Sequence, residues 1–373
     1  MTLGASSDLS ARAARVLFAV LLLGACSAPS VGTALSATPA DVLLPVGKTD
    51  IVDGRGRFRE IYCAVREDHG ATLPYDRPCQ DSAALWRLPD EPPPTGRPVR
   101  LGLSQAGLTV MLVPGLLAEC VSELSTLFED ARANLQAQGW RTGTIQTRGR
   151  QSSETNAEVV RDALMAMPAE QRVVLVTHSK GTVDSLQALA TYPELAGRVV
   201  ALVSVAGAVN GSPLADAVPT ALAELVSGSA LLACPPGRGA EAADSLRRSV
   251  RLAWLATHEL PRGVRTYSLA AYAGPDDMSR VLWPFYRTLA GTEPRNDGMV
   301  VAFDAIIPHS TLLGLPNADH LAVAMPFTAA KTPLLAGTLI DHNDYPRSVL
   351  LEAALRYVEE DLAAAALRTP STR

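Results

Sequence analysis

The sequence has few charged residues and no cluster of lysine and arginine. Only 19% of its 373 residues are charged and 47% are hydrophobic, a balance that excludes a disordered chain and allows a large buried core. The formal net charge is −5. Without a basic cluster, the chain lacks the electrostatic footprint that nucleic-acid binding requires. We therefore expect a globular protein, with one main domain and some additions, and no nucleic-acid partner.

The sequence also lacks an apolar run of the ~20 residues that a membrane-spanning helix needs. The run over 16–25 is shorter and follows two arginines, which is typical of a signal peptide. It ends in Leu23-Gly24-Ala25-Cys26, which resembles the lipobox of bacterial lipoproteins. In that interpretation residues 1–25 are removed, and Cys26 is acylated and anchors an exported protein in a membrane of the cell envelope. An ordinary signal peptide, cut for instance after Ala28, is the alternative.

Five cysteines suit an exported protein. With Cys26 assigned to lipidation, four remain, and these permit two disulfides in three pairings. Cys63 and Cys79 flank a short segment with proline and aspartate and are the natural local pair, which would leave Cys120 and Cys234 to form a long-range bridge. Free buried cysteines are the alternative, and the sequence alone does not fix the connectivity.

Two segments lie between the predicted signal peptide and residue 108. Residues 26–48 are rich in Ala, Ser, Thr and Pro and lack the periodicity of helices and strands, which predicts a flexible tether. Residues 49–107 mix charged, Pro and Gly residues, and we expect an irregular N-terminal subdomain there, stapled by Cys63 and Cys79.

From residue 108 onward, short apolar runs alternate with helical stretches. The patterns predict strands at 109–113, 142–147, 172–177, 199–205 and 264–272, and helices at 121–138, 153–167 and 181–190. This alternation implies parallel strands with helices on both faces of the sheet. The predicted fold is a doubly wound α/β core over 108–213 and 263–367. Residues 214–262 interrupt it, as a cap or lid over the crevice where such sheets bind ligands.

One strand, turn and helix start has the pattern of a nucleophile elbow. The strand 172–177 runs into Thr177-His178-Ser179-Lys180-Gly181, and such a turn holds a serine on a strained backbone with its Oγ exposed at the end of the sheet. Gly181 fills one of the two small positions of the motif, but Thr177 stands where the consensus has glycine, so the elbow must open or the helix must shift. A plain helix N-cap is the alternative role for Ser179.

The strand at 109–113 ends in Pro114-Gly115-Leu116-Leu117, which is where the oxyanion loop of such an enzyme begins. The glycine lets the backbone turn an N–H toward the site, so we expect the backbone N–H groups of Leu116 and Lys180 to bind the oxyanion. A Pro-Gly turn that merely ends the strand is the alternative.

A base and an acid follow Ser179 in the order that this fold requires, the acid before the histidine. His320 lies in a short polar stop between two apolar stretches and is the predicted base, with His342 as runner-up; His178, on the elbow itself, is expected to give support. Asp297, in a turn before the predicted strand 299–303, is the predicted acid. Asp276 and Asp277, which follow the strand ending at Tyr272, compete for this role.

Together these residues resemble an α/β-hydrolase, and within that fold the bacterial triacylglycerol lipases and esterases. Three blocks carry the resemblance: 177–181, the Gly-Ser and Ala-Asp block at 207–216, and Asn296-Asp297-Gly298 with Asp319-His320. The resemblance implies a triad of Ser179, Asp297 and His320. Many such lipases have a calcium-ligand aspartate two residues after the histidine, where this chain has Ala322. We therefore expect no calcium site, and neither metal nor cofactor.

The expected reaction is the hydrolysis of an ester or lipid through an acyl-enzyme intermediate. Val218, Leu222, Leu225 and Val226 recur at helical spacing and would suit an amphipathic lid, or equally plain packing onto the core. Two other functions stay open. A surface lipoprotein could keep the hydrolase fold for binding alone, for which Thr177 is the best argument, and an acyltransferase or thioesterase could use the same triad.

Overall fold

A computed structural model describes residues 50–116, 118–217 and 239–368. These residues form one sheet of seven strands, in the order β1-β7-β6-β5-β4-β2-β3. Every neighbouring pair of strands is parallel. The strands are β1 (Val52–Asp53), β2 (Leu108–Val113), β3 (Arg141–Thr144), β4 (Arg172–His178), β5 (Val199–Val205), β6 (Arg265–Leu269) and β7 (Thr311–Gly314). The predicted parallel α/β architecture is confirmed.

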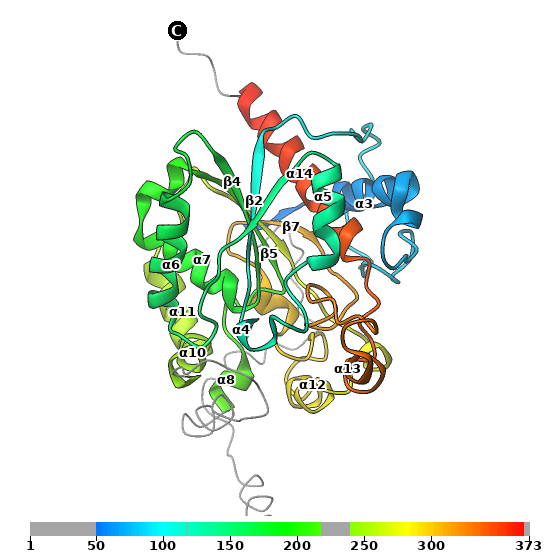
Figure 1. Cartoon of the computed structure of the whole chain (residues 1–373), viewed down its shortest axis with the longest axis vertical. Coiled ribbons are helices and arrows are strands. Elements are labelled where there is room, and N and C mark those ends of the chain that lie inside the picture. The colour runs from blue at the N-terminus through cyan, green and yellow to red at the C-terminus, as the bar shows by residue number, and fades with distance from the viewer. Residues whose placement is uncertain (1–49, 117, 218–238, 369–373) are drawn as a thin grey trace, which may run out of the picture. The chain divides into compact units, whose positions relative to one another are not determined.

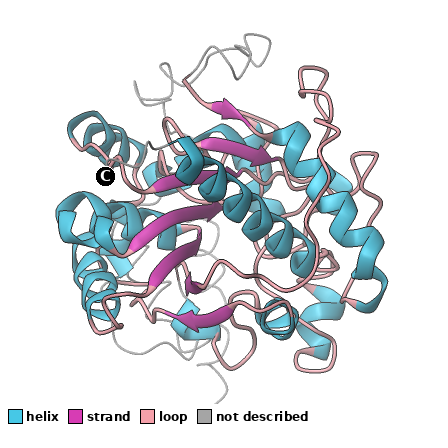
Figure 2. Cartoon of the chain, turned by 90° about the horizontal axis from the view of Figure 1, so that it is seen from above, coloured by secondary structure: helices cyan, strands magenta, loops and turns pink. Residues whose placement is uncertain are grey.

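Helices cover both faces of this sheet (Figures 1 and 2). The α-helices are α3 (Arg55–His69), α4 (Ala118–Val121), α5 (Arg132–Ala137), α6 (Ser153–Met165), α7 (Lys180–Thr191), α8 (Pro213–Ala217), α10 (Gly239–Ser245), α11 (Arg248–Thr257), α12 (Trp283–Ala290), α13 (Pro333–Thr338) and α14 (Arg347–Arg368). Short 3₁₀ helices are η2 (Gly70–Thr72), η3 (Glu129–Ala131), η4 (Pro193–Gly197), η5 (Pro275–Asp277) and η6 (Ala302–Ala305). No helix of these described ranges is long and apolar enough to cross a membrane.

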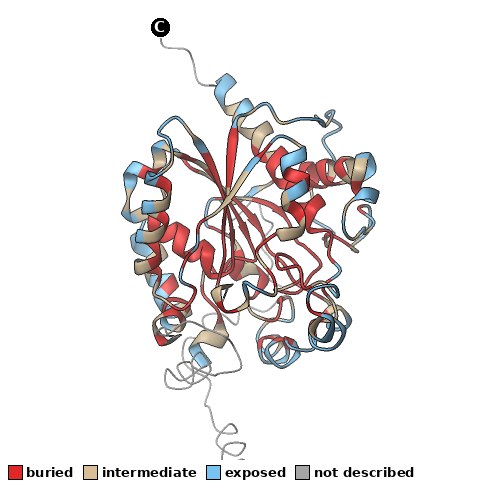
Figure 3. Ribbon diagram, in the orientation of Figure 1, coloured by how far each residue is buried: buried red, intermediate tan, exposed pale blue. Residues whose placement is uncertain are grey.

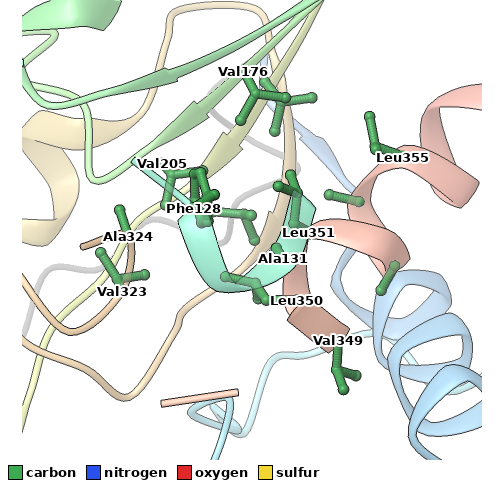
Figure 4. Packing of buried hydrophobic residues seen from close by; sticks show 14 of the residues in the cluster. Phe128, Ala131, Val176, Val205, Val323, Ala324, Val349, Leu350, Leu351 and Leu355 are labelled. Carbon is green, nitrogen blue, oxygen red and sulfur yellow. The ribbon is translucent and has the colours of Figure 1, made fainter. Parts of the chain in front are cut away.

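The core lies on both sides of the central strands. β4 and β5 are almost continuous runs of buried valine, leucine and alanine, as expected of parallel strands covered on both faces. Figure 3 shows this burial along the strands and the helices packed on them. On one face, the core includes Phe128 and Ala131 together with Val205 of β5 and Leu350 and Leu351 of α14 (Figure 4).

The prediction of one continuous helix over 121–138 is wrong. Instead, α4 ends at Val121, and the segment after it contains the 3₁₀ helix η3 and the short helix α5. Phe128 has left-handed backbone angles, φ 49° and ψ 35°, and its N–H donates to the carbonyl of Ala324, 2.9 Å away. This tertiary hydrogen bond takes a donor that a continuous helix would need for itself, so no continuous helix passes through Phe128.

The N-terminal extension has more regular structure than predicted. β1 adds a strand to the sheet edge beside β7, and the 15-residue helix α3 packs against α14 and β7. The predicted disulfide between Cys63 and Cys79 is formed. The chain beyond it reaches the C-terminal half of the protein, because the N–H of Asn317 donates to the carbonyl of Ala84 at 2.9 Å and the hydroxyl of Tyr345 donates to the same oxygen at 2.8 Å.

Cys120 is also disulfide-bonded. Its predicted partner Cys234 lies outside the described residues, as do Cys26, the signal peptide and the tether. These pairings and processing steps stay predictions.

Replacing both Cys63 and Cys79 by serine should lower the free energy of unfolding by about 2–4 kcal/mol, because a bridge across 16 residues restricts the unfolded chain. Urea unfolding of the double variant measures this change. Wild-type protein unfolded without reductant is the reference, and an unchanged unfolding midpoint would contradict the prediction.

Candidate active site

Ser179 lies at the sharp turn between β4 and α7, in a conformation that a serine rarely adopts. Its backbone angles are φ 53° and ψ −126°. Such angles cost of order 1–3 kcal/mol and persist only where the surrounding structure enforces them. Ser179 is the N-cap residue of α7, yet its side chain makes no capping hydrogen bond. A simple helix cap therefore does not account for this serine, and its strained backbone is compatible with the predicted nucleophile elbow.

Two glycines allow the chain to crowd around Ser179. A Cβ on Gly181 would lie 2.3 Å from the carbonyl oxygen of Val113, so only glycine lets α7 begin beside the end of β2. A Cβ on Gly115 would lie 2.7 Å from the Cβ of Ser179 and 3.2 Å from the backbone nitrogen of Lys180. The predicted oxyanion loop, with Leu116 as its next residue, thus lies directly against the serine and the N–H that follows it.

Thr177 is accommodated at the elbow through its hydroxyl. Its Oγ1 lies 2.8 Å from the Oγ1 of Thr182, which lies 3.1 Å from the Oγ of Ser204. All three side chains are buried, so each hydroxyl finds a partner without water. A hydrogen-bonded network on β4, α7 and β5 stands where the consensus motif has a glycine.

The side chain of Lys180 is also fixed. It is fully buried on the first turn of α7, and its Nζ donates to Asp184 at 2.7 Å. The other carboxylate oxygen of Asp184 accepts from Asn156 at 2.8 Å. This buried pair, which the sequence analysis missed, holds the residue whose backbone N–H follows the serine.

Asp297 and His320 meet in the structure. The Nδ1 of His320 lies 2.6 Å from the Oδ2 of Asp297, and the side chains are 7% and 1% exposed. Their backbones are joined as well, because the N–H of His320 donates to the carbonyl of Asp297 at 2.8 Å. The side chain and main chain together fix the orientation of the imidazole.

The turn that carries Asp297 explains the Asn-Asp-Gly sequence. The other carboxylate oxygen of Asp297 accepts from the N–H groups of Met299 and Val300, at 2.8 and 2.7 Å. Gly298 has φ 91°, which favours glycine, and donates its N–H to the side chain of Asn296 at 3.0 Å. Because Asp297 takes these N–H groups, they cannot join a ladder, and the strand predicted at 299–303 is wrong: η6 begins at Ala302.

His178 supports His320. Its Nε2 lies 3.0 Å from the carbonyl oxygen of His320, and the two rings are 4.6 Å apart. Burial, and then the neighbouring His320, hold the pKa of His178 well below its ordinary value of 6.5, so this ring is neutral and can donate its Nε2 proton to that carbonyl.

The competing residues lie elsewhere. Asp276 and Asp277 are in the 3₁₀ helix η5, Asp276 exposed and Asp277 partly so. The side chain of His342 is 38% exposed and pairs with Asp341. Of the three candidate acids, Asp297 is the one whose carboxylate contacts His320.

Sequence reasoning gave no role to Asp319, the buried neighbour of His320. One of its oxygens accepts from the N–H groups of Leu321 and Ala322, at 2.9 and 2.8 Å, and the other from Ser279 at 3.0 Å. An Asp side chain commonly accepts hydrogen bonds from the backbone N–H groups that follow it. The aspartate before His320 was therefore a signal that the sequence offered. Asp319 therefore shapes the loop that presents His320.

No calcium-type cluster accompanies this loop. Among the residues that the structure describes, no group of three or more His, Cys, Asp or Glu side chains is placed to hold a metal ion. Ala322 has no donor atom beyond its backbone. Of the insertion predicted to form a cap, the structure describes α8, α10 and α11. The predicted lid residues Val218, Leu222, Leu225 and Val226 lie outside the described part of the chain.

Comparison with solved structures gives a match over nearly the whole chain. The crystal structure of the metagenomic carboxyl esterase MGS0156 is 54% identical, with a TM-score of 0.83, over 90% of this chain and 100% of that one. The chain belongs to the carboxyl esterases. The structure of EstA from Clostridium botulinum, at 12% identity and a TM-score of 0.50 over 81% of this chain and 98% of that one, is similar in fold alone. No family model matches the chain, and neither does any curated protein.

In this carboxyl esterase the block after β5 is tied to the segment after Asp297. The N–H of Asn210 donates to the carbonyl of Asp304 at 2.9 Å, and the Nδ2 of Asn210 to its carboxylate at 3.3 Å. Arg248, on the first turn of α11, pairs with the same carboxylate at 3.2 Å. Asp304 thus connects the described part of the insertion over 214–262 to the segment that follows Asp297, a role that sequence reasoning missed.

Asp304 should make the esterase less stable as the pH rises. Burial raises the pKa of Asp304 from 3.8 to about 6, against the opposing effect of Arg248. Between these two values the folded state keeps a proton that the unfolded state releases, so the contribution of Asp304 to stability falls as the pH rises to 6 and stays low above it. Asp304→Asn should remove this loss of stability. The melting temperature of the variant minus that of wild type should therefore be more positive at pH 8 than at pH 4.5.

Thermal unfolding at the two pH values measures the effect. Asp276→Asn, at an exposed carboxylate, is the matched control and should follow wild type. Parallel pH profiles for wild type and Asp304→Asn would contradict the assignment.

Proposed function

We propose that this carboxyl esterase hydrolyses ester or lipid substrates with Ser179 as nucleophile, His320 as base and Asp297 as acid. The observation that carries the proposal is the 2.6 Å contact between Asp297 and His320. The carbonyl oxygen of the same His320 lies 3.0 Å from the ring of His178, the residue before Ser179. With Nδ1 engaged by the carboxylate, the imidazole of His320 keeps Nε2 for the proton of Ser179. The MGS0156 relationship supports the same chemistry.

The reaction proceeds in two steps. His320 takes the proton of Ser179 while the Oγ attacks the acyl carbonyl, and it then protonates the departing alcohol. The backbone N–H groups of Leu116 and Lys180 bind the oxyanion, supported by the close approach of Gly115 to the nitrogen of Lys180. Water then releases the acyl group from Ser179. Asp297 stays ionised throughout and stabilises the imidazolium.

Ser179→Ala should abolish the hydrolysis of 4-nitrophenyl butyrate and labelling by a fluorophosphonate probe, because the attacking oxygen is lost. The fold should persist, as judged by circular dichroism, since the Ser179 side chain makes no capping bond. Labelling of the variant at the wild-type rate would remove Ser179 from the mechanism. Wild-type protein that takes no label would favour the alternative of a binding protein without catalysis.

Asp297→Asn should lower kcat by about 10⁴-fold, the loss known when the acid of such a triad becomes an amide and the histidine takes the wrong tautomer. Steady-state kinetics on the same ester measure it. Asp276→Asn and Asp277→Asn are matched controls that should lose less than twofold. If either control lost more kcat than Asp297→Asn, the acid would have to be reassigned.

An acyltransferase, which passes the acyl group to an acceptor other than water, and a thioesterase, which hydrolyses a thioester, are the second candidates, because both use the same triad and acyl-enzyme. Product analysis with an added alcohol or thiol detects acyl transfer, and the rate on a thioester compared with the matching ester tests for a thioesterase.

We also propose that the enzyme is exported and anchored through Cys26, on the strength of the lipobox-like sequence and the signal-peptide pattern before it. The disulfide between Cys63 and Cys79 is typical of proteins outside the cytosol. Cells fed radioactive palmitate should label the wild-type chain and not Cys26→Ser. Equal labelling of both, or of neither, would contradict the anchor.

A further inference from the structure

The segment 207–212, which connects β5 to α8, contacts two parts of the proposed site, and the mechanism above gives it no role. Near its start, the N–H of Ala208 donates to the carbonyl oxygen of Ser179 at 3.2 Å. At its end, the hydroxyl of Ser212 donates to the carbonyl oxygen of Met299 at 2.5 Å. One short segment therefore joins the elbow to the turn that follows the proposed acid.

The backbone fixes the path of this segment before it reaches Ser212. The N–H of Gly211 donates to the carbonyl of Ala208 at 3.0 Å and closes a tight turn. Gly211 has φ 83°, which favours glycine, and a Cβ there would lie 2.5 Å from the carbonyl oxygen of Leu246. The N–H of Ser212 donates to that same carbonyl at 2.9 Å. The position of Ser212 relative to the elbow is thereby set by the main chain.

The hydroxyl of Ser212 is buried and directed toward one acceptor. The residue is 6% exposed, and its Oγ accepts the N–H of Leu214, in the first turn of α8, at 3.2 Å. A hydroxyl has a single proton to donate, and here the carbonyl of Met299 accepts it. The 2.5 Å distance is at the short end of the range for such bonds, so this contact holds Met299 closely.

Met299 passes the contact on to the proposed acid. Its N–H donates to the Oδ1 of Asp297 at 2.8 Å, and the Oδ2 of the same carboxylate lies 2.6 Å from the Nδ1 of His320. A continuous chain of hydrogen bonds thus leads from Ser212 through Met299 and Asp297 to the imidazole. Its other end is the backbone that Ala208 ties to Ser179.

We propose that Ser212 is a positioning residue for ester hydrolysis, whose hydroxyl holds the turn of Asp297 in place relative to Ser179. Its effect passes through Met299 and Asp297, because its own proton and oxygen are engaged by the protein. The inference rests on the proposed function, since Ser212 affects the rate only if Asp297 is the acid. Small displacements of groups that orient a reacting side chain are costly in rate.

Steady-state kinetics of Ser212 variants on 4-nitrophenyl butyrate test the proposal. Ser212→Ala should lower kcat by about 10- to 100-fold, the loss that a misplacement of roughly 1 Å causes. KM should stay close to the wild-type value, because the change loosens the turn of Asp297 and removes no group assigned to binding the ester. Ser212→Thr keeps the hydroxyl and should retain most of the wild-type kcat. A Ser212→Thr variant as slow as Ser212→Ala would contradict a role for the hydroxyl.

A double-mutant cycle separates positioning from general damage. Ser212→Ala should lower kcat far less in the Asp297→Asn background than in wild type, because a residue that acts through the Asp297 carboxylate then has nothing left to position. The rate of Ser179→Ala is subtracted as the background. Equal factors of loss in the two backgrounds would overturn the proposal.

Ser310→Ala is the matched control for the loss of a buried hydroxyl. Ser310 is 1% exposed, and its Oγ lies 2.9 Å from that of Ser268. It precedes the first residue of β7, so it lies at the edge of the parallel sheet opposite to the elbow. The control should lower the melting temperature and keep the wild-type kcat.

A Ser212→Ala variant that loses no more kcat than Ser310→Ala would overturn the proposal. If Ser212→Ala fails to fold, Ser212→Cys replaces it in the same measurements. Cysteine keeps the shape of the side chain but supplies only a weak donor, so the same loss of kcat, smaller in size, is expected.

The failure of the proposed function has a different signature. In that case Ser179→Ala or Asp297→Asn would keep the wild-type kcat. Hydrolysis that depends on both of these residues, with kcat unchanged in Ser212→Ala, would contradict the role of Ser212 alone.

Discussion

The left-handed backbone of Ser179 is the constraint around which the site is organised. A serine keeps φ 53° and ψ −126° only because β4 enters the turn as a fully buried strand and α7 leaves it against the end of β2. The absence of side chains at Gly181 and Gly115 permits that packing. The strain on one residue is offset by the burial of the strand and helix on either side of it.

The proposed acid and base, Asp297 and His320, depend on backbone hydrogen bonds as much as on their own contact. Asp297 holds the N–H groups of Met299 and Val300, and Asp319 holds those of Leu321 and Ala322. Each carboxylate thereby folds the loop on which it stands. The carbonyl of Asp297 then receives the N–H of His320, so the two loops have one relative position rather than several. Such preorganisation lets a site act without rearranging during the reaction.

The sequence was informative where local pattern determines structure, and less so where distant contacts do. Buried strands such as β4 and β5 are plain from their apolar runs, and the order of Ser179, Asp297 and His320 predicts the pair that the structure brings into contact. The break at Phe128 depends on a carbonyl almost 200 residues away, Ala324, and no local pattern encodes it. Likewise, the role of Asp304 appears only once segments far apart in the sequence are packed together.

The N-terminal extension and the C-terminal half of the chain together support the loop that carries His320. Ala84 accepts hydrogen bonds from Asn317 and Tyr345, and β1 pairs with β7, all contacts of very long sequence separation. Contacts of this kind form late, because a long loop must close before they repay its entropy. A chain still emerging from the ribosome holds Ser179 before it has Asn317 or β7. The support beneath His320 is therefore completed only when the whole chain is present, and partial products of synthesis lack it.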